Sequence, residues 1–329
     1  MTATLTRPPS AATGVWLDDA GRDLITTDGL RRLVHGLGVR GLMCTADATT
    51  EELRLACGML SARGVVSAAP VLHGGADAGA LLGEARLLHR MVARPNLLVR
   101  LPAALWALPV VTRLLAEGIG VHTAWIGSPA RYEAFLDAFH AGLSRVREAG
   151  GDLAAVRAVA SVPVRHIDAA VDGRLDAVGG HETAALRGRA GRAVASLAHH
   201  AHQEFLASAR WRSLAAAGAV EPRLVWSLGG PPSPADGIRD RLADLAAPDT
   251  AAAVPASALT PLAHGLPEPV GSGPARHRED ARRVVAFLDW YGVSAEDAAT
   301  RVEGKGLARM LPGSVAGARG VTGCATPVP

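Results

Sequence analysis

Polar side chains interrupt several of the most apolar segments of this chain, and they mark the places where chemistry could occur. Arg100 lies within PNLLVRLPA, His122 lies within GVHTAWIG, and Asp18 follows the apolar start of GVWLDD. Histidine exchanges protons near neutral pH, a carboxylate can carry a second proton, and a guanidinium can hold a carboxylate or an enolate-like oxygen. Whether these groups share one site depends on the elements that position them.

Short apolar segments alternate with helical patterns along the whole chain, which predicts about eight βα units. Each strand is a run rich in Val, Leu, Ile or Ala that precedes a longer segment with helical spacing and capping residues. The predicted strands cover residues 14–19, 39–44, 65–72, 96–102, 120–127, 156–164, 223–230 and 249–255. The predicted helices cover residues 26–38, 49–64, 77–93, 107–118, 128–150, 165–179, 183–208 and 278–292.

This alternation favours an α/β fold of the (β/α)8 TIM-barrel type with extra helices, in which functional residues gather at the C-terminal ends of the strands. A doubly wound sheet is the rival fold, but no G-x-G-x-x-G motif follows the first strand. We expect a disordered lead at 1–13, a single barrel at 14–310 and a loosely ordered tail at 311–329.

Composition narrows the class of protein. Of the 329 residues, 49% are hydrophobic, yet no run of about 18 apolar residues indicates a membrane span. The net charge of +3 is scattered, and no basic stripe is interleaved with aromatic residues, so nucleic-acid binding is not expected. Three cysteines show no paired motif, and the start of the chain shows no signal segment, which together suit a cytoplasmic protein.

Several long stretches resemble actinobacterial-type transaldolases. They include VWLDDAGRDLITTDGLRRLV, RPNLLVRLPAALWALPVVTRLLAEGIGV, SPARYEAFLDAFHAGLSRVREAGGDL and ALRGRAGRAVASLAHHAHQEFLASARWRSLAAAGA. The resemblance extends from about residue 14 to about residue 310. It implies a transaldolase-like barrel in which a lysine on the fourth strand forms a Schiff base and a carboxylate on the first strand carries protons. Asp18 matches that carboxylate.

The lysine position of the family is occupied by Arg100 in this chain, where LLVRLPAA stands in place of LLIKIPAT. A guanidinium stays charged and is a poor nucleophile, so Arg100 cannot form an imine. Lys305 is the only lysine, and we do not expect it to reach the barrel centre.

Other positions at which the resemblance implies functional residues have also changed. Ala69 stands at the place of an acid and Ala124 at the place of a threonine, while His166 and Pro232 stand where basic residues bind phosphate. Ser161 is retained, and His122 matches an asparagine that faces the barrel interior. We therefore predict that ordinary Schiff-base transaldolation is lost.

The predicted site gathers new polar groups around the retained Asp18. The predicted catalytic residues are Asp18, Arg100, His122 and His166, and the predicted substrate-binding residues are His73, Trp125, Ser161, Arg165 and Ser227. Trp125 could instead pack behind its strand. No cofactor and no metal is predicted. The partner would be a small carbonyl or sugar-derived compound, and the chain could form a homodimer.

Three functions remain open at this point. The first is a repurposed enzyme that performs a lysine-independent isomerisation, elimination, aldol-like or cyclisation step, a chemistry that would suit specialised metabolism. The second is an inactive pseudoenzyme with a binding or structural role, in which Arg100 and Asp18 form a neutralising ion pair and the histidines only satisfy hydrogen bonds. The third is the conventional pentose-phosphate transaldolase that overall similarity implies.

Histidines on the long predicted helix offer a weaker alternative. His199 and His202 have the i, i+3 spacing that can chelate a metal, but helix packing or solvent exposure is the favoured interpretation.

Overall fold

Eight parallel strands close into a barrel in the described part of the chain. The computed structural model describes residues 14–26, 28–36, 39–60, 64–72, 77–231, 237–247, 249–258 and 277–311. Each strand pairs with the next in sequence, and the first pairs with the last. The strands are β1 (Gly14–Ala20), β2 (Gly41–Cys44), β3 (Val65–Ala68), β4 (Leu97–Pro102), β5 (Val121–Ala124), β6 (Ala158–Pro163), β7 (Arg223–Ser227) and β8 (Thr250–Pro255). The predicted (β/α)8 barrel is confirmed, and each of its eight strands overlaps its predicted segment, although β3, β5 and β7 end earlier than predicted. The lead 1–13 and residues 312–329 of the tail lie outside the described residues.

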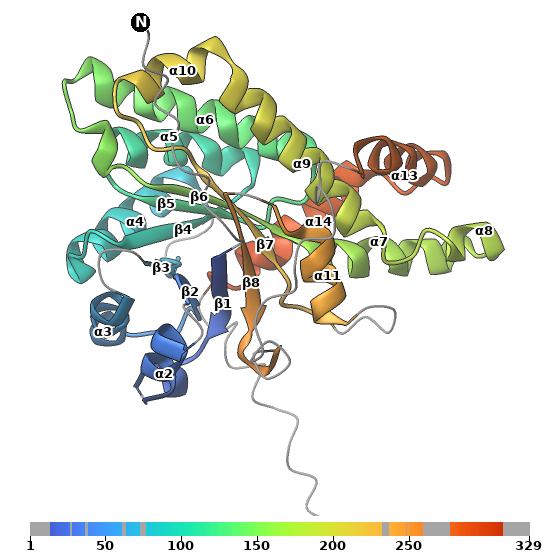
Figure 1. Ribbon diagram of the computed structural model, residues 1–329, viewed down its shortest axis with the longest axis horizontal. Coiled ribbons are helices and arrows are strands. Elements are labelled where there is room, and N and C mark those ends of the chain that lie inside the picture. The colour runs from blue at the N-terminus through green and yellow to red at the C-terminus, as the bar shows by residue number, and fades with distance from the viewer. Residues whose placement is uncertain are drawn as a thin grey trace, which may run out of the picture.

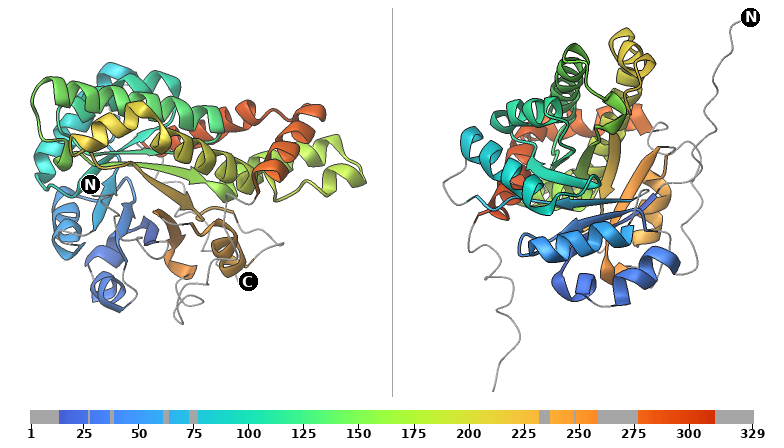
Figure 2. Two further views of the ribbon diagram at one scale, coloured as in Figure 1. Left: turned by 45° about the horizontal axis from the view of Figure 1, so that its top comes forward. Right: turned by 90° about the vertical axis from the view of Figure 1, so that its left-hand side faces the viewer.

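Helices surround the barrel, as Figures 1 and 2 show. They are α1 (Arg22–Thr26), α2 (Asp28–Gly36), α3 (Thr50–Leu60), α4 (Ala78–Val92), α5 (Leu108–Ala116), α6 (Pro129–Glu148), α7 (Val164–Val178), α8 (His181–Ala184), α9 (Ala190–Ala207), α10 (Ala209–Ala216), α11 (Ile238–Leu245), α13 (Arg278–Trp290) and α14 (Ala295–Ala308). Local sequence explains several of their starts. Thr49 and Glu52 form a reciprocal capping box at α3, and Ser128 caps α6 ahead of Pro129.

Apolar side chains fill the barrel interior towards the N-terminal ends of the strands. Trp16, Met43, Leu98, Val159, Val225, Ala251 and Ala253 form this cluster, one or two from each contributing strand. Gly41 is required beside Trp16, because a Cβ at position 41 would lie 2.0 Å from the indole Cδ2. The barrel is therefore packed below its mouth, and any site must lie at the C-terminal ends of the strands.

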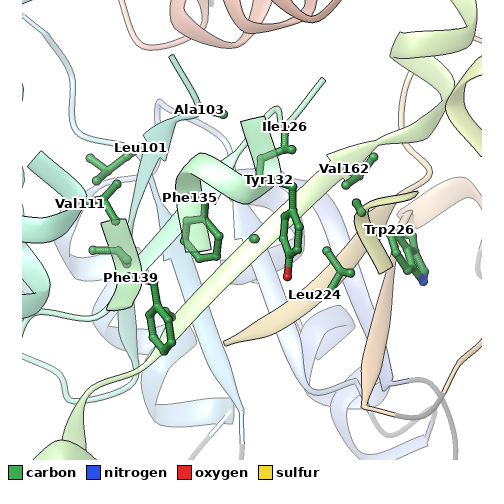
Figure 3. Close-up of a cluster of buried hydrophobic side chains, with 14 of the residues drawn as sticks. Leu101, Ala103, Val111, Ile126, Tyr132, Phe135, Phe139, Val162, Leu224 and Trp226 are labelled. Carbon is green, nitrogen blue, oxygen red and sulfur yellow. The ribbon is translucent and has the colours of Figure 1, made fainter. Parts of the chain in front are cut away.

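A second core lies between the barrel and its helices. Figure 3 shows Val111, Tyr132, Phe135 and Phe139 gathered close to residues of the neighbouring strands, such as Leu101 and Leu224. These side chains are buried and mostly aliphatic or aromatic. Their burial fixes the strand ends that carry the polar groups of the mouth.

The helix predicted over 183–208 is divided in the structure. Two carboxylates on α7 cause the break: Asp172 accepts a hydrogen bond from the Gly188 amide, and Asp168 accepts one from the Gly191 amide. Gly188 also adopts a left-handed backbone with φ of 69°. Helix α8 therefore ends at Ala184, and α9 begins at Ala190.

Helix α14 was not predicted from the sequence, and it is the element that brings the C-terminal segment to the barrel mouth. Ser294 caps it by accepting hydrogen bonds from the amides of Glu296 and Asp297. The buried guanidinium of Arg131 on α6 holds the helix through Glu303 at 2.6 Å and Glu296 at 2.8 Å. Helix α14 also packs against α7, with which it lies on one side of the molecule (Figure 2).

Candidate active site

Six polar side chains reach the barrel interior above the apolar layer. They are Asp18 on β1, Ser67 on β3, Arg100 on β4, His122 on β5, Ser161 on β6 and Ser227 on β7. Each of them either follows a residue of the apolar interior cluster by two positions on the same strand or pairs in register with such a residue on a neighbouring strand. Because alternate side chains of a β-strand point to the same face, all six face the barrel interior. The barrel thus brings together residues that are more than 200 positions apart in the chain.

His122 is held by two serines in the centre of the barrel. Its Nδ1 lies 2.6 Å from the Ser67 hydroxyl and its Nε2 lies 2.8 Å from the Ser161 hydroxyl. The ring is fully buried, and burial together with the charge of Arg100 holds its pKa well below the ordinary value. A neutral ring can donate from one nitrogen and accept at the other, so both of its hydrogen bonds are satisfied by serines.

Asp18 is bound to Ser227 rather than to Arg100. The Ser227 hydroxyl donates a hydrogen bond of 2.5 Å to Oδ2 of Asp18. Burial and the neighbouring charge of Asp19 raise the pKa of Asp18, while the bond from Ser227 and the charge of Arg100 oppose that rise. The net result is a pKa above the ordinary aspartate value, so the protonated form of Asp18 is more favoured than in an exposed carboxyl group.

Arg100 turns towards β2 and donates a hydrogen bond to the carbonyl oxygen of Cys44. No carboxylate oxygen of the described residues lies within 4.0 Å of its guanidinium nitrogens. The neutralising ion pair between Arg100 and Asp18, one of the alternatives open from the sequence, is therefore absent from the described part of the chain.

A cavity of about 240 Å³ opens at the C-terminal ends of the first five strands. Its walls come from the ends of β1 to β5 and from the C-terminal segment, and they consist of Asp19, Thr45, Ala46, Ala69, Arg100, Leu101, Pro102, Trp125, Gly306, Arg309 and Met310. A second cavity of about 20 Å³ lies deeper, where Arg100 meets Asp18, Ser161, Ser227 and His166. Arg100 borders both spaces, whereas Asp18 borders the smaller one and not the larger one.

Comparison with known proteins assigns this barrel to a family. The family described as Transaldolase/Fructose-6-phosphate aldolase matches residues 43–227. A protein named Transaldolase from Mycolicibacterium paratuberculosis (strain ATCC BAA-968 / K-10) is 32% identical, with 92% of each chain covered. The chain belongs to the transaldolase/fructose-6-phosphate aldolase family. Proteins of the same name from Arthrobacter sp. (strain FB24), at 30% identity over 94% of each chain, and from Thermobifida fusca (strain YX), at 32% over 92%, agree with this assignment.

In this transaldolase-family barrel, Trp125 lies at the larger cavity, not behind its strand. The structure ends β5 at Ala124, and Trp125 adopts a left-handed backbone with φ of 69°. This turn brings the indole to the mouth, where its ring centroid lies 4.8 Å from that of His166. The strand predicted over 120–127 is wrong beyond Ala124, where the turn at Trp125 ends it, and Ile126 packs in the outer core.

His166 occupies the first turn of α7 and borders the smaller cavity. Burial and the charges of Arg309, Lys305 and Arg165 lower its pKa to about 4. Its ring is therefore neutral near pH 7. Among the described residues its buried Nδ1 has no hydrogen-bond partner.

The other predicted site residues have different positions. Ser161 and Ser227 border the smaller cavity, whereas Arg165 borders neither of the two cavities in the described part of the chain. His73 lies outside the described residues. Lys305 is exposed on α14 and borders neither cavity, in agreement with the expectation that it does not reach the barrel centre.

Two histidines of α9 contact buried aromatic residues. Nδ1 of His202 forms a hydrogen bond of 2.8 Å with the Tyr132 hydroxyl, and the ring of His199 packs against Trp226. Within the described residues no cluster of three or more His, Cys, Asp or Glu side chains could hold a metal ion.

The same part of the chain contains no helix long and apolar enough to span a bilayer.

Residues from outside the predicted site complete it. Arg309 pairs with Asp19 at 3.1 Å and lies over the Trp125 ring at 4.9 Å from its centroid. Gly306 packs so close that a Cβ there would lie 2.4 Å from Cγ of Trp125. Ser67 was also missed, although strand alternation along VVSAAP places it on the same face as Val65 and Ala69 and could have revealed it.

Proposed function

We propose that this member of the transaldolase family performs acid–base chemistry on a small carbonyl compound without forming a lysine imine. The observation that carries the proposal is that Arg100 borders both the larger cavity and the smaller cavity that Asp18 lines. The family resemblance implies a lysine at this position, and the single lysine, Lys305, is exposed on α14. A guanidinium there stabilises negative charge but forms no covalent bond to a carbonyl carbon.

Asp18 is the group that moves a proton in this proposal. Its ionised form removes a proton from the carbon next to the carbonyl, the C–H electron pair forms a C=C bond, and the carbonyl oxygen takes the negative charge. Arg100 holds that oxygen, and the proton returns from Asp18 to carbon or oxygen. Isomerisation, elimination, aldol-like addition and cyclisation can all start from the same enolate.

His166 and His122 have different surroundings, and the proposal therefore gives them different roles. His166 borders the smaller cavity, and because its pKa is about 4 its ring is neutral and weakly basic near pH 7. The proposal therefore gives it a hydrogen-bonding role towards the substrate. His122 is occupied by Ser67 and Ser161 and borders neither cavity within the described residues. We therefore assign His122 a structural role in place of the catalytic role expected from the sequence.

Two measurements test this proposal. The protein is first incubated with fructose 6-phosphate and borohydride and examined by intact mass, with a lysine-containing transaldolase as the positive control. We expect no reduced dihydroxyacetone adduct on this chain. The second measurement follows incorporation of deuterium from solvent next to the carbonyl of hydroxyacetone and of 4-methyl-2-oxopentanoate by NMR. Exchange that is lost in Asp18→Asn and retained in the exposed control Asp23→Asn supports the proposal.

The conventional activity is the second candidate, because the relatives at 30–32% identity carry the name Transaldolase. A trapped adduct, with transfer of the three-carbon unit to an aldose phosphate, would establish it and overturn the proposal. A non-catalytic binding role is favoured by the small size of the inner cavity, which at about 20 Å³ has room for one water. Absence of both adduct and proton exchange would support that role.

A further inference from the structure

We propose that the larger cavity is a binding site for a small monocarboxylate with an apolar body, of the 2-oxo acid class, and not for a sugar phosphate. This inference rests on the proposed function and names the substrate class of the same site. Three properties of the cavity carry it: its charge, its walls and its size.

The charged side chains that line the cavity favour a ligand with one anionic group. Arg309 is already paired with Asp19 at 3.1 Å, so its charge is balanced. Arg100 is partly buried, donates to the Cys44 carbonyl and has no carboxylate of the described residues within 4.0 Å. Asp18 is close enough for the charge of Arg100 to oppose the rise of its pKa, but the two form no ion pair. A half-buried guanidinium that is not ion-paired is stabilised by a carboxylate, which it can bind with two parallel hydrogen bonds.

A phosphate dianion is a poorer match for this arrangement. Phosphate sites in proteins usually combine several cations or a row of backbone amides at a helix N-terminus. Here one guanidinium is available, and Asp19 would lie on the same wall as a competing negative charge. Binding a dianion would require Arg309 to leave both Asp19 and the Trp125 ring.

The walls are apolar apart from these charged groups. The lining residues include Ala46, Ala69, Leu101, Pro102, Trp125 and Met310, and Thr45 is the one neutral hydroxyl among the lining residues that the structure describes. A sugar would leave several hydroxyl groups without partners on such walls, at a cost for each group that is desolvated. An alkyl or aryl body instead gains from leaving water.

The size of the cavity limits the ligand. Its volume of about 240 Å³ is below the range of about 300–1,000 Å³ that is common for sites of drug-sized ligands. A short branched or aromatic 2-oxo acid fits this scale. With its carboxylate and the adjacent carbonyl oxygen both on Arg100, its carbonyl carbon would lie towards the smaller cavity, which Asp18 and His166 line.

The test measures binding alone, with intact protein and no turnover. The probes are 4-methyl-2-oxopentanoate, its uncharged analogue 4-methyl-2-oxopentanamide, fructose 6-phosphate and inorganic phosphate, each followed by calorimetry and by tryptophan fluorescence. We expect the oxo acid to bind and the amide and both phosphates to bind at least tenfold more weakly. Arg100→Gln should raise the dissociation constant of the oxo acid at least tenfold, whereas the exposed control Arg90→Gln should leave it unchanged.

The remaining outcomes separate this inference from the proposed function. Oxo-acid binding that depends on Arg100 supports the inference even if no proton exchange is seen, in which case the proposed catalysis fails by itself. Tighter binding of fructose 6-phosphate or phosphate overturns the inference but leaves imine-free catalysis open. Oxo-acid binding that Arg100→Gln does not weaken also overturns it. The folding of each variant is checked by its thermal unfolding temperature before binding is compared.

Discussion

The Ser227 hydroxyl donates a hydrogen bond of 2.5 Å to Oδ2 of Asp18, and β8 alone separates their two strands. This bond gives the buried carboxylate a partner that is neutral, so Asp18 keeps the ability to gain a proton. Had Arg100 been that partner, the pair would have stayed ionised at all physiological pH values. The proposed proton transfer by Asp18 therefore depends on its pairing with Ser227 and not with Arg100.

Asp18→Asn should stabilise the protein at high pH. Because burial raises the pKa of Asp18 in the folded state, its ionised form is disfavoured there, and stability is lost as the pH rises through the folded pKa. We expect the variant to gain about 1 kcal/mol at pH 8 and nothing at pH 4, measured by urea unfolding. The exposed control Asp23→Asn should show no such trend. A gain that is equal at both pH values would contradict the raised pKa.

His122→Ala should be strongly destabilising, because it leaves a cavity in the barrel centre and two buried serine hydroxyls without a partner. The expected cost is about 3–5 kcal/mol in the free energy of unfolding, measured by urea denaturation. His122→Gln retains a donor and an acceptor and should cost less. His35→Ala, at an exposed position of α2, should change stability by less than about 0.5 kcal/mol. An equally small effect at His122 would remove its structural role.

The protein should lose stability progressively as the pH falls below about 6.5, the ordinary histidine pKa. The pKa values of His199 and His202 are lowered to about 4 and about 3 by burial, so the unfolded chain binds protons that the folded protein does not. Each such histidine contributes a slope of up to about 1.4 kcal/mol per pH unit. His199→Phe should reduce the slope of unfolding free energy between pH 6.5 and 4.5. A slope identical to that of the parent protein would contradict the assignment.

Gly306 and Gly304 should respond in opposite directions to alanine, although they lie on the same helix. A Cβ at Gly306 meets the Trp125 indole at 2.4 Å, whereas nothing lies within 4 Å of a Cβ at Gly304. We expect Gly306→Ala to destabilise by about 1–3 kcal/mol and to change the Trp125 fluorescence. Gly304→Ala should stabilise by up to about 1 kcal/mol through helix propensity. Thermal unfolding of the two variants side by side provides the comparison.

Sequence reasoning located the strands well because their signal is local. Each strand is a short apolar run followed by a helix with its own capping residues, and alternation along the run predicts which side chains face the interior. The unusual chemistry of Arg100 was also visible, since a guanidinium cannot become a nucleophile in any fold. The same alternation could have placed Ser67 beside His122, because it requires only the strand position.

The arrangement of side chains at the barrel mouth could not be predicted, because it depends on contacts between segments that are far apart in the sequence. Trp125 faces the cavity because its backbone adopts a left-handed conformation, which neighbouring packing imposes on a non-glycine residue. Arg309 meets Asp19 across 290 positions of sequence, after α14 has been fixed to α6 by Arg131.

The sequence by itself determined the barrel, the first-strand carboxylate and the absence of a lysine on the fourth strand. The tertiary structure decided which groups can act. In the folded protein, His122 forms hydrogen bonds with two serines, and Asp18 accepts a hydrogen bond from a neutral hydroxyl. Arg100 lines a small cavity with mostly apolar walls. The physical reason is that residue types set which chemistry is possible, whereas burial, charge balance and the neighbours of each polar atom depend on segments that meet only after folding.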